Sequence, residues 1–439
     1  MKNKYPLYFL AMALTCLLLS LLIGMFASLQ YAIPSFIKNI IPFTVFRPLH
    51  TLFAVSWIIF GAIGGIFYYI QKEDDTTKSS NLMKILFWVF SLTGIGIIIS
   101  YLMKDFEGKE YVEFPHFFYF PILIGWILFG IYYFKFLFSR KGLYPVYYYM
   151  WGTGIVAMVF HFTEAHLWIL SYFKGYYVQN LAMQWKANGS LVGAWNMLVY
   201  GTSMYVMTKT SGSDAYSRSK TAFFFYFLSL VNLMFNWAHH VYTLPIAPWV
   251  RIAAYIISMS EWLILFSIIY NWSRNLSKEK KIIYSPSHRF MVLSDVWIFL
   301  NLILAILISI PAINYFTHGT HFTVAHSMGA TIGINTTILF SSISYLLETH
   351  NPFSERAKRQ LKIGTNIFNI SFIGFWIVLI IMGIERSKWE YSENAVPFMV
   401  FREGMHNIYI AFAVFGAGIL TGLSLVLFHL SKKLKSCMR

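Results

Sequence analysis

The sequence predicts an all-α polytopic membrane protein that forms a single domain over residues 1–439. Two features of composition support this: hydrophobic residues make up 57% of the chain, and charged residues make up only 12%. A soluble domain carries roughly 25% charged residues. In addition, apolar blocks of about twenty residues recur along the whole chain, and this length crosses a hydrocarbon core about 30 Å thick as a helix. We therefore expect a bundle of twelve transmembrane helices.

The apolar blocks define the twelve predicted spans in chain order. They are Leu7–Ala27, His50–Gln71, Met83–Leu102, Phe117–Phe138, Val146–Phe173, Gly189–Thr208, Thr221–Tyr242, Ile252–Trp272, Met291–Pro311, Phe322–Leu347, Thr365–Ile384 and His406–Leu430. With the N-terminus inside, most of the 34 Lys and Arg residues fall in the inner loops and the two tails. The positive-inside rule then places both termini in the cytoplasm.

The net charge of +16 does not indicate a nucleic-acid partner. The basic residues lie in short loops between apolar blocks, as expected of a protein whose partner is the lipid bilayer. Cys16 lies in an apolar block and Cys437 lies in the tail. Two such cysteines exclude a disulfide framework and a thiolate metal cluster.

Histidines gather near the outer ends of several predicted spans. His50 opens the second span, His239 and His240 close the seventh, and His326 lies early in the tenth. Ionisable side chains inside a membrane are costly and usually functional, and imidazole nitrogens bind iron, copper and zinc. The pattern therefore predicts a metal or haem centre in the outer third of the bilayer. Further polar residues are expected at a similar depth, namely Glu164, His161, His166, Asn188 and Met328.

Six motifs occur in an order that is typical of one protein family. They are Arg47-Pro48-Leu49-His50, Gly108-Lys109-Glu110, Glu164-Ala165-His166, Ala182-Met183-Gln184-Trp185, Ala238-His239-His240 and the run from Thr317 to His326. The series resembles the catalytic subunit of cytochrome c-dependent nitric oxide reductase, a twelve-helix branch of the haem-copper oxidase superfamily. This resemblance covers nearly the whole chain.

The resemblance implies a haem-copper oxidase subunit I-like bundle in the inner membrane of a bacterium. It would hold a low-spin haem b, a high-spin haem b and a non-haem iron or other metal, and possibly calcium. A membrane-anchored cytochrome c subunit would donate electrons, because this chain has no Cys-x-x-Cys-His motif for covalent haem. The substrate would be nitric oxide, NO.

The resemblance also assigns roles to individual residues. His50 matches an axial ligand of the low-spin haem, and His326 matches the ligand of the high-spin haem. His239 and His240 match ligands of the non-haem metal. The carboxylates have other roles: Glu110 resembles a calcium ligand, Glu261 a buried group in proton supply, and Glu164 a group near the catalytic centre.

The sequence departs from the family pattern at two places. Where the family has a second histidine, the run here is His326-Ser327-Met328. Met328 either completes a His/Met haem with His50, which would raise its reduction potential, or only packs. The family's first non-haem histidine falls on Asn188 or Gly189, its glutamate on Val192 and a further acidic residue on Asn196. The predicted non-haem site therefore loses an imidazole and a carboxylate.

Three functions remain open at this stage. The first is reduction of two NO molecules to N2O and water with two electrons and two protons. The second is NO dismutation, which consumes no net electrons and is similar to the activity of relatives with altered non-haem ligands. The third is a non-catalytic haem protein that binds NO. Oxygen reduction to water is disfavoured, because the haem-copper oxidases that catalyse it use three histidines on copper.

Overall fold

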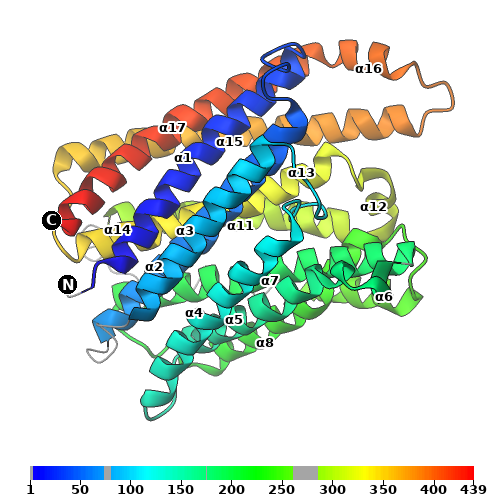
Figure 1. Cartoon of the computed structure of the whole chain (residues 1–439). Coiled ribbons are helices and arrows are strands. Elements are labelled where there is room, and N and C mark those ends of the chain that lie inside the picture. The colour runs from blue at the N-terminus through cyan, green and yellow to red at the C-terminus, as the bar shows by residue number, and fades with distance from the viewer. Residues whose placement is uncertain (1–2, 74–80, 175, 261–284) are drawn as a thin grey trace.

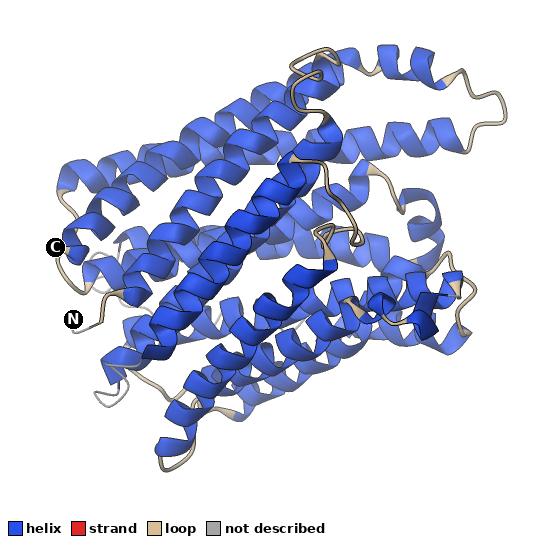
Figure 2. Cartoon of the chain, in the orientation of Figure 1, coloured by secondary structure: helices blue, strands red, loops and turns tan. Residues whose placement is uncertain are grey.

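The chain is helical in a computed structural model, which describes residues 3–73, 81–174, 176–260 and 285–439. Those ranges contain no strand (Figure 2). Figure 1 shows the long helices running side by side, with both termini at one end of the bundle and the short helices α6 (Ser171–Lys174) and α12 (Pro311–Thr317) at the other. The two ends are here called the terminal face and the far face.

Nine helices within the described ranges are long and apolar enough to cross a membrane. They begin with α1 (Tyr5–Ala32), α2 (Phe43–Glu73), α3 (Asn81–Leu102), the stretch His116–Ser139 that includes α4 (Tyr119–Ser139), and the stretch Lys220–Val241 that includes α8 (Lys220–Phe235). They continue with α11 (Ser285–Ser309), the continuous helix formed by α13 (His321–Met328), η5 (Gly329–Thr336) and α14 (Thr337–Glu348), and then α15 (Glu355–Glu390) and α17 (His406–Met438). The predicted all-α multi-pass fold is confirmed.

Three further predicted spans correspond to other helical segments. They are α5 (Val146–Ala165), α7 (Tyr177–Ser211) and the helical residues 248–260. The remainder of the predicted span Ile252–Trp272 lies outside the described residues. The count of twelve transmembrane helices therefore stays a prediction.

Several helix ends differ from the sequence prediction. Helix α2 begins at Phe43, so His50 lies two turns inside the helix instead of opening it. Helix α7 begins at Tyr177, twelve residues before the predicted start at Gly189. Hydropathy marks the lipid-crossing part of a helix, and polar residues can continue the same helix beyond it.

The predicted fifth span ends too late. Helix α5 ends at Ala165, and the chain continues through the 3-10 turn η3 (Leu167–Ile169) and α6. The backbone N–H of His166 bonds to the carbonyl of Thr163 at 3.0 Å, a three-residue step that tightens the helix end. The apolar residues after Ala165 therefore do not extend the long helix.

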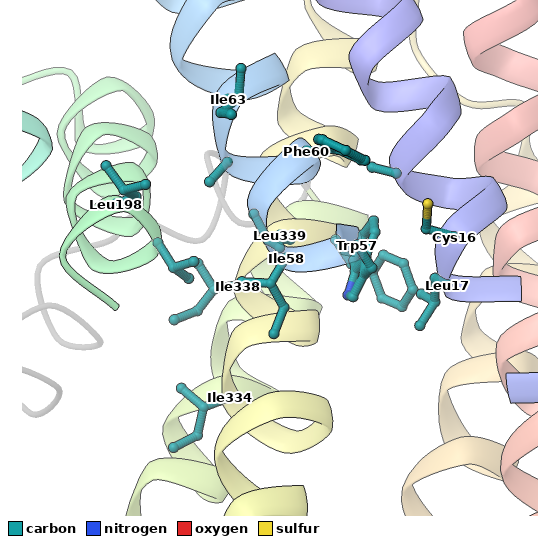
Figure 3. Close-up of a cluster of buried hydrophobic side chains, with 14 of the residues drawn as sticks. Cys16, Leu17, Trp57, Ile58, Phe60, Ile63, Leu198, Ile334, Ile338 and Leu339 are labelled. Carbon is teal, nitrogen blue, oxygen red and sulfur yellow. The ribbon is translucent and has the colours of Figure 1, made fainter. Parts of the chain in front are cut away.

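Two helical segments form the centre of the bundle. In their most apolar windows, 78% of α2 and 83% of the α13–η5–α14 helix are buried, against 28% of α3. Figure 3 shows their side chains meeting near Trp57, with contributions from α1 and α7. The indole N–H of Trp57 donates to Thr336 Oγ1 at 2.9 Å. The central helices are also those that carry His50, His326 and Met328.

The segment η5 is a π-helix inside this central helix. In a π-helix the backbone hydrogen bonds join residues five apart. Across the same interval, the Thr336 hydroxyl donates to the carbonyl of Thr331 at 2.9 Å. Two glycines admit neighbours from α11: a Cβ on Gly333 would lie 2.8 Å from the Trp297 ring, and one on Gly329 would lie 2.2 Å from Asn301 Oδ1. Such segments are often found beside functional sites, and this one follows His326 and Met328 directly.

The chain ends meet at the terminal face. The Lys4 ammonium donates to the backbone carbonyl of Met438. Helix α2 runs from the far face to the terminal face, and α7 and the α13–η5–α14 helix run in the same direction. These directions place Phe43, Tyr177 and His321 near the far face.

Candidate haem and metal site

One cavity between the helices collects most of the predicted site residues. Its volume is about 610 Å³, and it is lined by parts of α2, α7, α8, η4 (Asn236–Val241), α11, α13 and η5. The predicted site residues that line it are His50, Asn188, His239, His240, His326 and Met328. The sequence prediction that these six residues gather is therefore consistent with the fold.

The adjacent histidines face the cavity because the backbone changes at the end of α8. The α-helix ends at Phe235 and a 3-10 helix, η4, carries Asn236 to Val241. The rings of His239 and His240 lie 4.2 Å apart between centroids, with their planes at 40°. The His239 ring also meets the His326 ring, at 6.5 Å and 86°. Three imidazoles from two elements thus share one region of the cavity.

A short hydrogen-bonded series orients His239. Its Nδ1 lies 3.3 Å from Asn236 Oδ1, and the same oxygen accepts a bond from Ser258 Oγ at 2.5 Å. The Nδ1 atom therefore carries the proton. The buried Nε2 atom of His239 has no hydrogen-bond partner among the described residues. This leaves an imidazole lone pair available for a ligand, as a metal-binding histidine requires.

His240 is held by an aromatic contact that the sequence did not indicate. The ring of Trp185 stacks on it with centroids 5.5 Å apart and planes at 11°. The ring of Tyr111 in turn contacts Trp185 edge to face, with centroids 6.2 Å apart. Gly189 lets α7 approach η4 closely, because a Cβ there would lie 2.7 Å from Trp237 Cβ. Trp185 belongs to a family motif, but nothing in the motif specifies the stack.

His50 is positioned from α1. Its Nδ1 lies 2.9 Å from the carbonyl oxygen of Ser20 and 3.3 Å from the Ser20 hydroxyl. A Cβ on Gly24 would lie 2.8 Å from the same ring, so only glycine leaves room for it. With Nδ1 donating to a backbone carbonyl, Nε2 is the nitrogen left for a ligand. This arrangement fits an axial haem ligand.

The α7 positions that replace family ligands share one face. Asn188, Val192 and Asn196 are spaced by four residues and all line the cavity. Asn188 is buried, and its amide donates to the backbone carbonyl of Glu110 at 3.3 Å. Asn196 Oδ1 accepts from Asn335 at 3.1 Å. This face of α7 is therefore uncharged.

Glu110 lies outside the cavity and pairs with arginine. Arg47 Nη1 is 3.4 Å from Glu110 Oε1, and Arg47 Nη2 is 2.6 Å from Glu113 Oε1. Burial raises the pKa of the Glu113 carboxyl, although the Arg47 charge acts in the opposite direction. A guanidinium between two carboxylates does not fit a calcium site formed by Glu110 at this position. The calcium role of Glu110 stays a prediction.

Glu164 is not a cavity-lining residue. One carboxylate oxygen is 2.9 Å from His161 Nδ1, and the other forms an ion pair with Lys186 of α7. The group joins α5 to α7 beside the stack of Trp185 on His240. Its catalytic role stays a prediction. Glu261 lies outside the described residues.

The donor set fits the haems better than the non-haem metal. His50 and His326 line a cavity whose surface is mostly apolar, and His326 Nδ1 is buried without a described hydrogen-bond partner. Among the described residues no group of three or more His, Cys, Asp or Glu side chains is arranged to hold a metal ion. The non-haem position has two imidazoles, those of His239 and His240.

Fold and site together define a class: an all-helical, multi-pass membrane protein with imidazoles around a buried cavity. Residues 4–418 match the model of one family, cytochrome c and quinol oxidase polypeptide I. The chain belongs to this family, which is subunit I of the haem-copper oxidases. Its members bind haems and a metal centre and are oxidoreductases.

Individual relatives are distant. The chain is 24% identical over 391 residues to a nitric oxide reductase subunit of Stutzerimonas stutzeri, covering 82% of this chain and 77% of the relative. It is 25% identical over 441 residues to a cytochrome c oxidase subunit 1 homologue of Agrobacterium tumefaciens (strain T37), covering 93% and 79%. A haem-copper terminal oxidase dimer solved by cryo-electron microscopy superposes with a TM-score of 0.74 at 12% identity, covering 98% of this chain and 84% of that one.

Proposed function

We propose that this chain reduces NO to N2O as the catalytic subunit of a nitric oxide reductase-type enzyme. Two NO molecules, two electrons and two protons give one N2O and one water. The main support is the convergence of His239, His240 and His326 on one buried cavity. The relative from Stutzerimonas stutzeri named above adds support.

The proposal assigns each cofactor to residues that line the cavity. His326 would hold the high-spin haem b, and His50 with Met328 would hold the low-spin haem b. His239 and His240 would hold a non-haem iron or another metal. When bound, the haems and the metal would supply electron transfer, which histidine side chains alone cannot perform.

The chain's own residues would orient the ligands and shape the cavity. Asn236 and Ser258 fix the His239 ring, and Trp185 fixes the His240 ring. The uncharged α7 face and the apolar lining of the cavity favour a small neutral gas over an ionic substrate.

The proposal also covers the electron donor of the enzyme and its orientation in the membrane. A membrane-anchored cytochrome c subunit would donate electrons at the far face, near His50. The terminal face would lie in the cytoplasm of a bacterium, since the basic runs 356–362 and 432–439 lie in the first turns of α15 and at the end of α17, at that face.

The test begins with the purified chain together with any copurifying cytochrome. Haem and non-haem iron are measured per protein, followed by NO consumption with and without a reductant. Two haems, one further iron and reductant-dependent N2O are the expected results. Haem without turnover would contradict the proposal and leave a haem protein that binds NO.

NO dismutation is a second candidate, favoured by the uncharged residues Asn188, Val192 and Asn196 on the cavity face of α7. This reaction converts two NO molecules into N2 and O2 without external electrons. The same assay separates the two activities, because dismutation gives O2 and N2 in the absence of reductant. Reductase activity gives N2O only when electrons are supplied.

A further inference from the structure

Helices α15 and α17 bring two groups of basic residues together at the terminal face. The segments 355–362 and 429–439 contain eight Lys and Arg residues and a single acidic residue, Glu355. The first segment begins α15 and the second ends α17. The two helices run side by side in opposite directions (Figure 1), so both basic segments lie at the same end of the pair.

Close packing fixes the position of one basic segment relative to the other. A Cβ on Gly364 of α15 would lie 2.8 Å from the carbonyl oxygen of Gly422 of α17, and a Cβ on Gly422 would lie 2.8 Å from the carbonyl oxygen of Gly364. The two backbones therefore touch at this level. Arg356 is eight residues before Gly364, so in this antiparallel pair it lies level with residues eight to ten beyond Gly422, near Lys432.

The electrostatics of the region agree with this placement. The charges of Arg356 and Lys432 both act on the imidazole of His429, although Arg356 comes from the other helix. Like charges that are held close together repel, and an anionic group between them relieves the repulsion. The two helix ends thus favour a negatively charged partner.

Most of these basic groups have no anionic partner within the protein. Lys358 pairs with Glu355 at 2.8 Å, and Lys433 donates to the backbone carbonyl of Pro352 at 3.2 Å. Five other basic side chains are exposed and form no ion pair or hydrogen bond with another described residue, namely Arg356, Arg359, Lys362, Lys432 and Lys435. Their charges are available to a partner outside the chain.

The exposed apolar side chains of the same helices show where lipid chains would lie. Four exposed isoleucines of α15 are spaced by seven residues, namely Ile363, Ile370, Ile377 and Ile384. Residues seven apart share one side of a helix. At 1.5 Å per residue this stripe is about 32 Å long, close to the hydrocarbon thickness of about 30 Å. It begins directly after Lys362, and on α17 the exposed ring of Phe428 lies one turn before Lys432. Both helices therefore change from apolar to basic at the boundary between lipid chains and headgroups.

We propose that the ends of α15 and α17 form a binding site for an anionic phospholipid. The phosphate group would lie between Arg356 and Lys432, and the acyl chains would lie along Ile363 and Phe428. Basic pockets between membrane helices are suited to such headgroups. Separate basic anchors would attract the whole membrane surface, whereas this site needs both helices. The inference does not depend on the proposed function.

The experiment titrates the purified full chain, with any copurifying subunit, in detergent. Phosphatidylglycerol is compared with phosphatidylcholine of the same chain length, and native mass spectrometry counts the bound lipid molecules. The first phosphatidylglycerol is expected to bind the wild type about 10-fold more tightly than phosphatidylcholine. Arg356→Gln combined with Lys432→Gln is expected to weaken this binding about 10- to 30-fold, since each basic residue near an anionic lipid surface contributes a factor of about 5.

Lys135→Gln combined with Lys141→Gln is the matched control. Lys135 lies near the end of α4 and Lys141 follows that end, so this variant also removes two exposed positive charges at the terminal face. It should bind phosphatidylglycerol as the wild type does. Equal weakening in the two double variants would overturn the inference, because the basic residues would then act only as separate anchors.

Inorganic phosphate distinguishes a lipid site from a site for free anions. Added in large excess over the lipid, it should leave phosphatidylglycerol bound, because the acyl chains also contribute to binding. Displacement of the lipid by phosphate would refute the assignment to a phospholipid.

Thermal unfolding gives a second measurement. A ligand that binds only the folded state raises its stability, so phosphatidylglycerol should raise the unfolding midpoint of the wild type and of the control above the value in phosphatidylcholine. The midpoint of the Arg356 and Lys432 double variant should match the wild type in phosphatidylcholine and should rise less in phosphatidylglycerol. An equal rise in all three proteins would contradict the proposed site.

Discussion

Trp185 lies parallel to the imidazole of His240, with the two ring centroids 5.5 Å apart and the planes at 11°. The second ring beside His240 is that of His239, at 4.2 Å. His240 is thus held between an indole from α7 and its own neighbour in η4. Its orientation depends on a contact between elements far apart in sequence.

Replacing Trp185 tests this contact. Trp185→Leu removes an aromatic stack worth about 0.5–1.5 kcal/mol, so we expect roughly 2- to 10-fold weaker binding of added Fe²⁺ at the non-haem position. Trp185→Phe should keep most of the affinity. The measurement is equilibrium dialysis with iron analysis, and equal affinity in the leucine and phenylalanine variants would contradict the stacking role.

Gly189 provides a steric test of the same region. In Gly189→Ala the new Cβ would lie 2.7 Å from Trp237 Cβ and 3.1 Å from its Cα, so η4 must shift. Overpacking of this kind costs about 1–3 kcal/mol, and we expect a lower thermal unfolding midpoint. Gly94→Ala is the control, because Gly94 also lines the cavity but has no atom within 4 Å of the new Cβ.

The ion pair between Lys186 and Glu164 should stabilise the contact of α5 with α7. Lys186→Met leaves the Glu164 carboxylate, whose side chain is 12% exposed, with His161 alone. Loss of one partner of a largely buried polar pair costs about 1–3 kcal/mol. Arg218→Ala breaks a solvent-exposed pair with Asp214 and should cost much less. Equal losses of thermal stability would argue against the buried role.

Met328 can be tested through the potential of the haem held by His50. If Met328 is the second axial ligand, Met328→His replaces a thioether by an imidazole and lowers the midpoint potential. Met328→Leu removes the ligand and should give a high-spin spectrum. Redox titration followed by optical spectroscopy measures both effects. Unchanged spectra in both variants would show that Met328 only packs.

Restoring the missing imidazole is a gain-of-function test. Asn188 is buried in the cavity wall, so Asn188→His adds a donor on the face that carries Val192 and Asn196. We expect more tightly held non-haem iron, measured per protein after dialysis against a chelator. Asn232→His, on α8 in the same cavity, serves as the control. Iron retention equal to the wild type would indicate that position 188 points away from His239 and His240.

The fold class and the residue types of the site could be predicted from the sequence. Long apolar blocks predict membrane helices whatever their neighbours are, and the order of histidine motifs indicates the family. The arrangement of His239 and His240 needed more, because two adjacent residues face one cavity only when the backbone leaves the α-helix. The 3-10 geometry of η4 depends on packing against α7, which a linear pattern does not contain.

The roles of single carboxylates were harder to predict. Glu164 and Asp295 both lie in apolar spans, and hydropathy treats them alike. Their surroundings in the fold differ. Glu164 forms an ion pair with Lys186 of another helix, whereas Asp295 lines the cavity. Trp185 shows the same limit, because its stack depends on the relative rotation of α7 and η4.

The π-helix η5 has a consequence for how this chain could have changed over time. A π-turn is equivalent to one residue added to an α-helix, and one residue corresponds to a rotation of about 100°. Deleting one residue between Gly329 and Thr336 would therefore return this turn to α-helical geometry and keep His326 and Met328 in register with α14, whose buried face is fixed by Ser341, Ser342 and their partners. Inserting or deleting one residue outside η5, in the α-helical parts, would instead turn the two halves relative to each other.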